Sequence, residues 1–256
     1  AMLTPQSGPG NGWWLLLASI AASGILALVI GALVMRTRGI YFIMATLAFA
    51  QMVYFVFHDI EYFGGSDGTY IYFRPEFSLF GFRLVDLEDT HQFYWFSLAA
   101  LIFTVAALAQ LLRSRLGHAI VGIKHNEQRM RATGYNTNAY KLASFVIGGA
   151  FAGLAGFLFS LQYGYVSPEI ASWHHSGNGL LMIILGGLGS LGGAIIGAFA
   201  FVLLSEWFTA LTKHWQLLLG GFIIFVVMLM PYGLVGLPRQ LREWRARNAN
   251  KGGAIR

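Results

Sequence analysis

The residues best suited to chemistry lie in one polar segment, residues 113–141, which separates two long apolar stretches. The segment carries six basic residues and a single acid, Glu127. Lys and Arg accumulate in cytoplasmic loops of membrane proteins, so the segment is predicted to lie inside the cell. Glu127 and Arg131 are four residues apart, a spacing that supports a helix. The sequence leaves two interpretations open: a solvated loop that only sets topology, or a helix that docks against a cytoplasmic partner.

The same segment contains the signals of two helix starts. Asn126 is a suitable cap for a short helix over residues 127–132, and Gly134 suits the left-handed position just after its end. Asn136 or Thr137 then caps a second helix, which continues into the next apolar stretch. We therefore expect a small helix across the mouth of two membrane helices.

The composition places these elements in a membrane. Charged residues make up 11% of the chain and hydrophobic residues 56%, and the mean hydropathy is +0.60. Soluble domains have about 25% charged residues. The pI is about 9.7, but the basic residues lie in short loops and form no surface stripe, so we expect no nucleic-acid partner. The chain has no cysteine, which excludes disulfides and thiolate metal sites.

Six apolar stretches of membrane-spanning character predict an all-α, polytopic transmembrane helical bundle in a multi-pass protein surrounded by lipid. They cover residues 13–35, 39–57, 93–112, 142–163, 180–204 and 216–230. We expect one transmembrane domain over residues 1–238 and a basic cytoplasmic tail over residues 239–256. An outside N-terminus without a signal peptide favours further spans before residue 1.

The glycine-rich stretch 180–204 is predicted to be broken. The tail has six basic residues and one acid and should lie inside, whereas a complete fifth crossing would place it outside. The number of membrane crossings agrees with an inside tail if residues 180–185 enter the membrane part way and residues 193–204 return to the same side. A broken element needs protein or a water-filled cavity beside it, which favours a substrate pathway here. A single bent helix with a glycine packing face stays open. The candidate pathway or helix-break residues are Gly186, Gly187, Gly189, Ser190, Gly193 and, on another span, Thr46.

The sequence lacks the residues that several kinds of functional site require. The apolar cores contain no Asp, Glu, Lys, Arg or His, which argues against an ion-coupled carrier. The glycines of residues 186–193 lack the Lys of a phosphate-binding loop, and no H-E-x-x-H or G-x-S-x-G motif occurs. His174 and His175 are adjacent and point in different directions on a regular element. We therefore predict no enzyme active site, metal or cofactor, and a source of energy outside the chain.

Five separated motifs resemble one family. They are RGIYFIMATLAFAQM at residues 38–52, GGSDG at 64–68, GIKHNEQRMRATGYNTNAYKLASF at 122–145, ILGGLGSLGGAIIGA at 184–198 and PYGLVGL at 231–237. In this order they resemble the inner-membrane permease subunits of branched-chain amino-acid ABC importers, and most of all the M-type subunit.

The resemblance implies a bacterial inner-membrane subunit that forms a heterodimer with a paralogous permease. Two cytoplasmic ATPase subunits and a periplasmic or extracellular substrate-binding protein would complete the importer, which would work by alternating access. The residues that match the family's ATPase-contacting loop are His125, Asn126, Glu127, Gln128, Arg129, Arg131, Gly134 and Tyr135. The residues implied at the outer mouth or binding-protein face are Gly64, Gly65, Ser66, Asp67 and Gly68.

The alternatives to an amino-acid importer differ in their need for partners. The family also includes permeases for urea, short amides and aromatic acids. A passive channel for a small neutral solute such as urea or an amide would share the uncharged interior but need no ATPase. An anchor or assembly factor would recruit a partner through the basic loop without moving.

Overall fold

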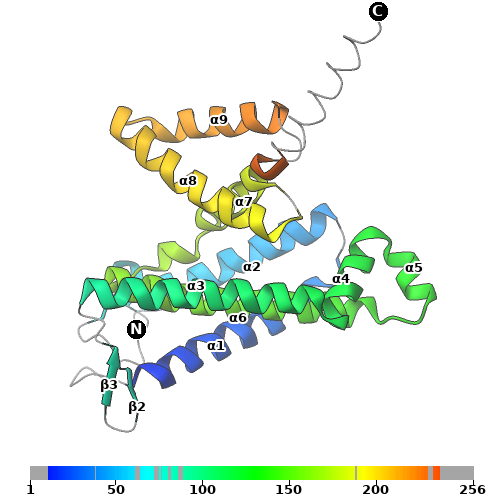
Figure 1. The fold of residues 1–256 in the computed structure, drawn as a ribbon, viewed down its shortest axis with the longest axis horizontal. Coiled ribbons are helices and arrows are strands. Elements are labelled where there is room, and N and C mark those ends of the chain that lie inside the picture. The colour runs from blue at the N-terminus through cyan, green and yellow to red at the C-terminus, as the bar shows by residue number, and fades with distance from the viewer. Residues whose placement is uncertain are drawn as a thin grey trace, which may run out of the picture. The chain divides into compact units, whose positions relative to one another are not determined.

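The computed structural model describes residues 11–37, 39–60, 64–71, 75, 77–79, 82–85, 89–187, 189–229 and 233–236 (Figure 1). The described chain is almost entirely helical, which confirms the predicted all-α architecture. It forms two compact units, unit 1 over Ala1–Trp173 and unit 2 over His174–Arg256. The single domain expected over residues 1–238 stays a prediction, and the tail at residues 239–256 lies outside the described residues.

Within the described residues, five helices are long and apolar enough to cross a membrane, and each lies over a predicted stretch. They are α1 (Gly12–Val34), α2 (Ile40–Asp59), α3 (Thr90–Arg113), α6 (Thr137–Tyr163) and α8 (Leu191–Leu211). Polar caps extend several of them beyond the apolar residues. The Asp89 carboxylate, for example, accepts a hydrogen bond from the His91 N–H at 3.0 Å and starts α3 before the predicted residue 93.

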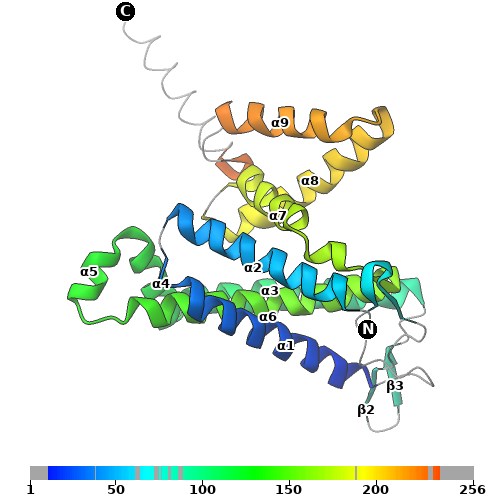
Figure 2. The same cartoon turned by 180° about the vertical axis from the view of Figure 1, so that it is seen from behind.

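Helices α1 and α6 run side by side and form the frame of unit 1 (Figure 2). They meet through small residues. A Cβ on Gly149 would collide with Ala27, and a Cβ on Gly153 would collide with Ser23. The Ser19 hydroxyl donates a hydrogen bond to the Gly153 carbonyl at 2.9 Å. Such close approach of two backbones is how helices associate in lipid, where apolar burial offers no driving force.

Short strands close one end of unit 1, which we call the strand end. β1 (Thr69–Tyr70) pairs antiparallel with β4 (Tyr165–Val166), and β2 (Phe77–Leu79) pairs with β3 (Phe82–Val85). The alternating aromatic residues Tyr70, Tyr72 and Phe77, which follow the GGSDG motif, predict a small hairpin or an interfacial hairpin-like cap. Phe77 instead begins its hairpin and is fully buried, whereas Tyr70 pairs with the chain that follows α6. Gly164, left-handed at φ 63°, ends α6 and makes this long-range pairing possible.

Unit 2 is built from α7 (Trp173–Gly186), α8, α9 (Trp215–Leu229) and the 3-10 turn η4 (Leu234–Gly236). Helices α8 and α9 form a hairpin. The buried core of unit 2 contains Leu185, Phe201, Leu219, Ile223 and Val226. At 15 residues, α9 is about 22 Å long, shorter than a usual membrane span.

The glycine-rich stretch is broken, as predicted, between α7 and α8. Gly187 and Gly189 have φ angles of 115° and 100°, which favour glycine because a Cβ would be strained there. A Cβ on Gly197 would collide with the Met182 carbonyl. In a continuous helix these two residues would lie about 22 Å apart, so the single bent helix is excluded. Whether the element re-enters the membrane stays a prediction.

Candidate coupling site

Two short helices connect α3 to α6 at the end of unit 1 opposite the strands, which we call the elbow end. They are α4 (Arg115–His125) and α5 (Glu127–Ala132). The sequence predicted α5 with its observed bounds, but not α4. Ser114 caps α4 by accepting a hydrogen bond from the Gly117 N–H at 3.3 Å. Ala119 and Ile123, four residues apart, face inward; this cap and spacing were the available signals.

Asn126 forms the bend between the two short helices. Its side-chain oxygen accepts a hydrogen bond from the Arg129 N–H at 2.9 Å, which confirms the predicted cap of α5. At the other end, Gly134 is left-handed with φ 88°, and the Tyr135 N–H donates to the Met130 carbonyl at 3.1 Å. Met130 packs on Gly122 of α4. Both ends of α5 are therefore defined by capping.

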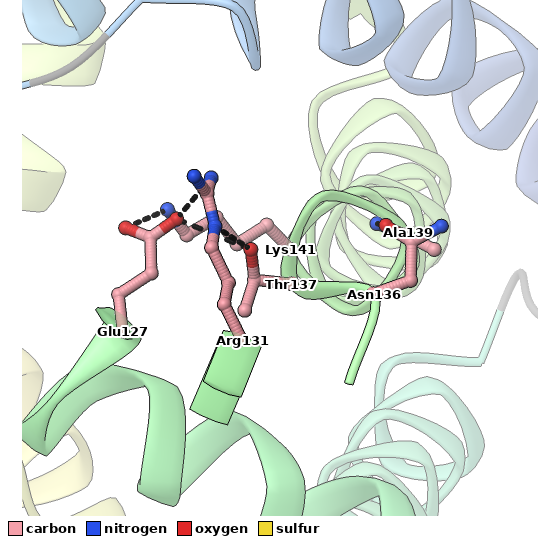
Figure 3. Close-up of polar contacts among 6 residues, drawn as sticks. All are labelled: Glu127, Arg131, Asn136, Thr137, Ala139 and Lys141. Carbon is pink, nitrogen blue, oxygen red and sulfur yellow. Dashed lines mark hydrogen bonds and ion pairs between the residues drawn. The ribbon is translucent and has the colours of Figure 1, made fainter. Parts of the chain in front are cut away.

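Glu127 has three partners, Arg131 on α5 itself and Thr137 and Lys141 on α6, and the last two connect the helices (Figure 3). Its Oε1 accepts from Arg131 Nη2 at 2.8 Å and from the Thr137 hydroxyl at 3.2 Å. Its Oε2 pairs with Lys141 Nζ at 2.7 Å. Arg131 Nε also donates to the Thr137 hydroxyl at 2.9 Å. We call these four residues, Glu127, Arg131, Thr137 and Lys141, the elbow cluster.

Burial and charge make the elbow cluster a partly protected ion-pair network. Thr137 is 2% exposed, and the Glu127 side chain is 26% exposed. The hydrogen bond from Lys141 lowers the pKa of Glu127 below its ordinary value of 4.5. Partial burial acts in the opposite direction, and the charges of Lys141 and Arg131 and the Thr137 hydrogen bond lower the pKa further. The carboxylate is therefore ionised at neutral pH.

Asn136, and not Thr137, caps α6. The sequence left both candidates open. The Asn136 side-chain oxygen accepts from the Ala139 N–H at 3.3 Å, and Figure 3 shows this contact to one side of the elbow cluster. Thr137 is thereby free to join Glu127 and Arg131 in the buried network.

The predicted coupling residues fall into two sets. Glu127 and Arg131 direct their charged groups to α6. The other residues of the predicted set lie on the exposed surface of the elbow, namely His125, Asn126, Gln128, Arg129, Gly134 and Tyr135. The sequence did not single out Thr137 and Lys141 as site residues, because their role depends on how α5 folds back onto α6.

The GGSDG motif lies at the strand end, at the far end of α6 from the elbow cluster. It forms the 3-10 turn η2 (Gly65–Asp67), between Gly64 at φ 94° and Gly68 at φ 71°. The Tyr165 hydroxyl donates to the Asp67 carbonyl at 2.6 Å. A Cβ on Gly68 would collide with the Val166 carbonyl. The motif is therefore fixed against β4.

The pathway candidates are divided between the two units. Gly186 and Gly193 pack against each other in unit 2, and Ser190 caps α8 by accepting from the Gly193 N–H at 3.0 Å. Thr46 lies on α2 in unit 1, where its hydroxyl donates to the Ile43 carbonyl of its own helix at 2.9 Å. Its hydrogen bond is thus satisfied without a neighbouring helix or a solute.

Comparison with known proteins gives one family and several curated relatives. The family described as the branched-chain amino acid transport system / permease component matches residues 1–229. The permease protein LivM of Escherichia coli K12 is 29% identical over 253 residues, covering 90% of this chain and 59% of LivM. LivM of Salmonella typhimurium is 30% identical over 253 residues, with the same coverage. The permease protein LivH of Escherichia coli K12 is 29% identical over 150 residues, covering 56% of this chain and 48% of LivH.

The chain spans about three fifths of the length of the LivM relatives. No solved structure matches it. All of the curated relatives named above are described as permease proteins of a high-affinity branched-chain amino acid transport system.

The long apolar helices indicate a multi-pass helical membrane protein, and the family match identifies its class as a permease component. The family match covers most of the chain and includes four of the five motifs read from the sequence; PYGLVGL at residues 231–237 lies beyond its end. The chain belongs to the family of branched-chain amino acid transport system permease components.

Proposed function

We propose that this chain is a permease subunit of an ATP-driven importer in the bacterial inner membrane. It would translocate branched-chain or related amino acids by alternating access. Its partners would be a paralogous permease, two cytoplasmic ATPases that hydrolyse the ATP, and a periplasmic or extracellular substrate-binding protein. The family match and the descriptions of LivM and LivH support this proposal. The absence of Asp, Glu, Lys, Arg and His from the apolar stretches fits a permease powered by other subunits.

The observation that supports coupling best is the attachment of α5 to α6 by the elbow cluster. A six-residue helix is too short to be stable alone, so its position depends on its contacts. The Glu127–Lys141 pair connects α5 to the first turns of α6. Since α6 packs along α1, a displacement of α5 would be passed to the frame of unit 1.

In this proposal, the two sets of elbow residues have different roles. His125, Gln128 and Arg129 are exposed and would contact an ATPase directly. Glu127 and Arg131 are positioning residues that hold α5 on α6. For the elbow to act as a switch, the two nucleotide states of the ATPases must favour different arrangements of the permease.

The other predicted sites keep their proposed places in the same mechanism. The GGSDG turn would lie at the outer mouth or binding-protein face, which its position at the opposite end of α6 supports. The break between α7 and α8 would lie beside the pathway. The reversal of the chain at Gly187 and Gly189 supports this because irregular backbone within a membrane needs protein or water around it.

The direct test replaces Glu127 by Gln in the assembled importer, reconstituted with its binding protein. This change removes the charge but keeps the shape. Substrate-stimulated ATP hydrolysis and uptake should fall about fivefold, because partly exposed ion pairs contribute up to about 1 kcal/mol. Glu206→Gln is the matched control: Glu206 is an exposed acid on α8, outside the elbow. Its uptake should equal that of the unmodified importer.

Two results would contradict the proposal. One is equal uptake by the Glu127→Gln and Glu206→Gln importers, which would remove the elbow from coupling. The other is substrate uptake that continues after the ATPases are left out, which would favour the passive channel. Membrane insertion, measured for each variant, must be unchanged for the comparison to apply.

A further inference from the structure

A cavity of about 490 Å³ opens beside the elbow cluster in unit 1. Its walls come from the chain between α1 and α2, from α4 and from the start of α6. The apolar wall includes Met35, Phe42, Ile120, Ile123 and Phe145. Phe42 and Phe145 meet edge to face with ring centroids 6.3 Å apart. The volume is in the range of pockets that hold small ligands.

The polar wall of this cavity carries a net positive charge. Lys124, Glu127 and Lys141 all line it. The Lys141 ammonium is paired with Glu127 at 2.7 Å. Lys124 is exposed, and its ammonium makes no ion pair or hydrogen bond within the part of the chain that is described. One positive charge is therefore left over beside an apolar wall, an arrangement suited to a monoanionic amphiphile.

The position of the cavity indicates which amphiphile this is. Met35 and Thr37 follow the end of α1, and Phe42 lies in the first turn of α2. The cavity therefore lies where two long apolar helices end, at the level of lipid headgroups. Arg36, also exposed, lies between two of the lining residues in the sequence. Basic pockets between membrane helices on the cytoplasmic side bind anionic lipid headgroups.

We propose that this cavity binds the phosphodiester headgroup of an anionic phospholipid of the inner leaflet, such as phosphatidylglycerol. Lys124 contacts the phosphate, and the start of one acyl chain lies against Phe42, Ile120 and Phe145. The inner-leaflet assignment depends on the orientation given under the proposed function. A lipid held here contacts the chain between α1 and α2 as well as α4 and α6, and so stabilises the elbow end.

The test measures lipids retained by the purified importer after reconstitution in an equal mixture of phosphatidylglycerol and phosphatidylcholine. Native mass spectrometry should show preferential retention of phosphatidylglycerol. Lys124→Gln should reduce that preference about fivefold, since one basic residue near a membrane surface contributes about 1 kcal/mol. Ser144→Phe, which fills the cavity without changing charge, should reduce it as well. Lys213→Gln, at the exposed turn between α8 and α9, should leave it unchanged.

Competition identifies the ligand. Neither inorganic phosphate nor leucine at 10 times the lipid concentration should displace the retained lipid. Displacement by phosphate would mean that the cavity binds a free anion and not a lipid. Displacement by leucine would mean that it is an amino-acid site. Either result overturns the proposal. Equal retention of the two lipids by the unmodified importer, or equal loss with Lys124→Gln and Lys213→Gln, also overturns it. Uptake measured in phosphatidylcholine alone tests the proposed function separately.

Discussion

Helix α6 makes two contacts of opposite character, one with α1 and one with α5. Its contact with α1 consists of small residues, with Gly153 against Ser19 and Ser23. Its contact with α5 consists of charged groups, with Lys141 against Glu127. The contact with α1 depends on the absence of side-chain atoms at Gly153. The contact with α5 depends on the ionisation of the Lys141 and Glu127 side chains. The two contacts should therefore respond to different perturbations.

The difference suggests that the α1–α6 contact is a rigid frame and that the α5–α6 contact, which we call the joint, is adjustable. Close packing in lipid has few alternatives, because any added atom must displace a backbone. An ion pair that is about one-third exposed on the Lys141 side exchanges its partners for water at a cost of about 1 kcal/mol. A transporter that moves its elbow while keeping α1 and α6 together would need both properties.

The largest effect should come from adding bulk to the frame. Gly153→Val places methyl groups where the Ser23 hydroxyl and the Ser19 carbonyl lie. Overpacking of this kind costs about 1–3 kcal/mol. We expect a clear loss of stability to chemical unfolding in detergent. Gly156→Val is the matched control on the same helix, because among the described residues no atom of another element lies within 4 Å of a Cβ there. Equal loss of stability in the two variants would show that α1 and α6 do not pack as described.

A smaller effect should follow from breaking the joint. Glu127→Gln removes the charge that holds Lys141, and amide hydrogen exchange over α5 should become up to about fivefold faster. Lys141→Met should give a similar increase, and the double variant should add little to either single change. Exchange over the middle of α6 should not change in any of the three. Additive effects of the two substitutions would mean that the ion pair does not hold α5.

The sequence was sufficient for the elements that depend on local signals. The long helices follow from apolar length, α5 from Asn126 and Gly134, and the break after α7 from glycine and the charge of the tail. Gly149 and Gly153 are four residues apart, a spacing of small residues that predicts the close helix contact found there. These features can be predicted from residues that are close together in the sequence.

The features that sequence did not reveal depend on contacts between distant segments. Tyr70 was assigned to a local hairpin but pairs with Tyr165. Thr137 was a candidate cap but is buried beside Glu127, ten residues away. Nothing within a few residues of either position distinguishes the two outcomes. The cavity beside Lys124 could not be predicted for the same reason, since its walls come from separate parts of the chain between residues 35 and 145.

The smallest effect should come from acid, and its sign follows from the pKa of Glu127. That pKa is lower in the folded chain than the ordinary 4.5, chiefly because of Lys141. The carboxylate therefore contributes stability that is fully present above pH 4.5 and is lost as the pH falls through the folded value. Between pH 7 and pH 5 the exchange of α5 amides, corrected for intrinsic rates, should be constant.

At pH 4, below the ordinary pKa of 4.5, exchange over α5 should begin to rise, but by less than in the Glu127→Gln variant at pH 7, because the lowered pKa keeps the folded carboxylate ionised more than an ordinary one. The Glu127→Gln variant has no charge to lose at this position and should show no such rise. The α1–α6 contact around Gly153 contains no titratable group, so exchange there should be the same at both pH values. A matching rise over α1 and α6 would mean that acid opens all of unit 1, and the distinction between frame and joint would fail.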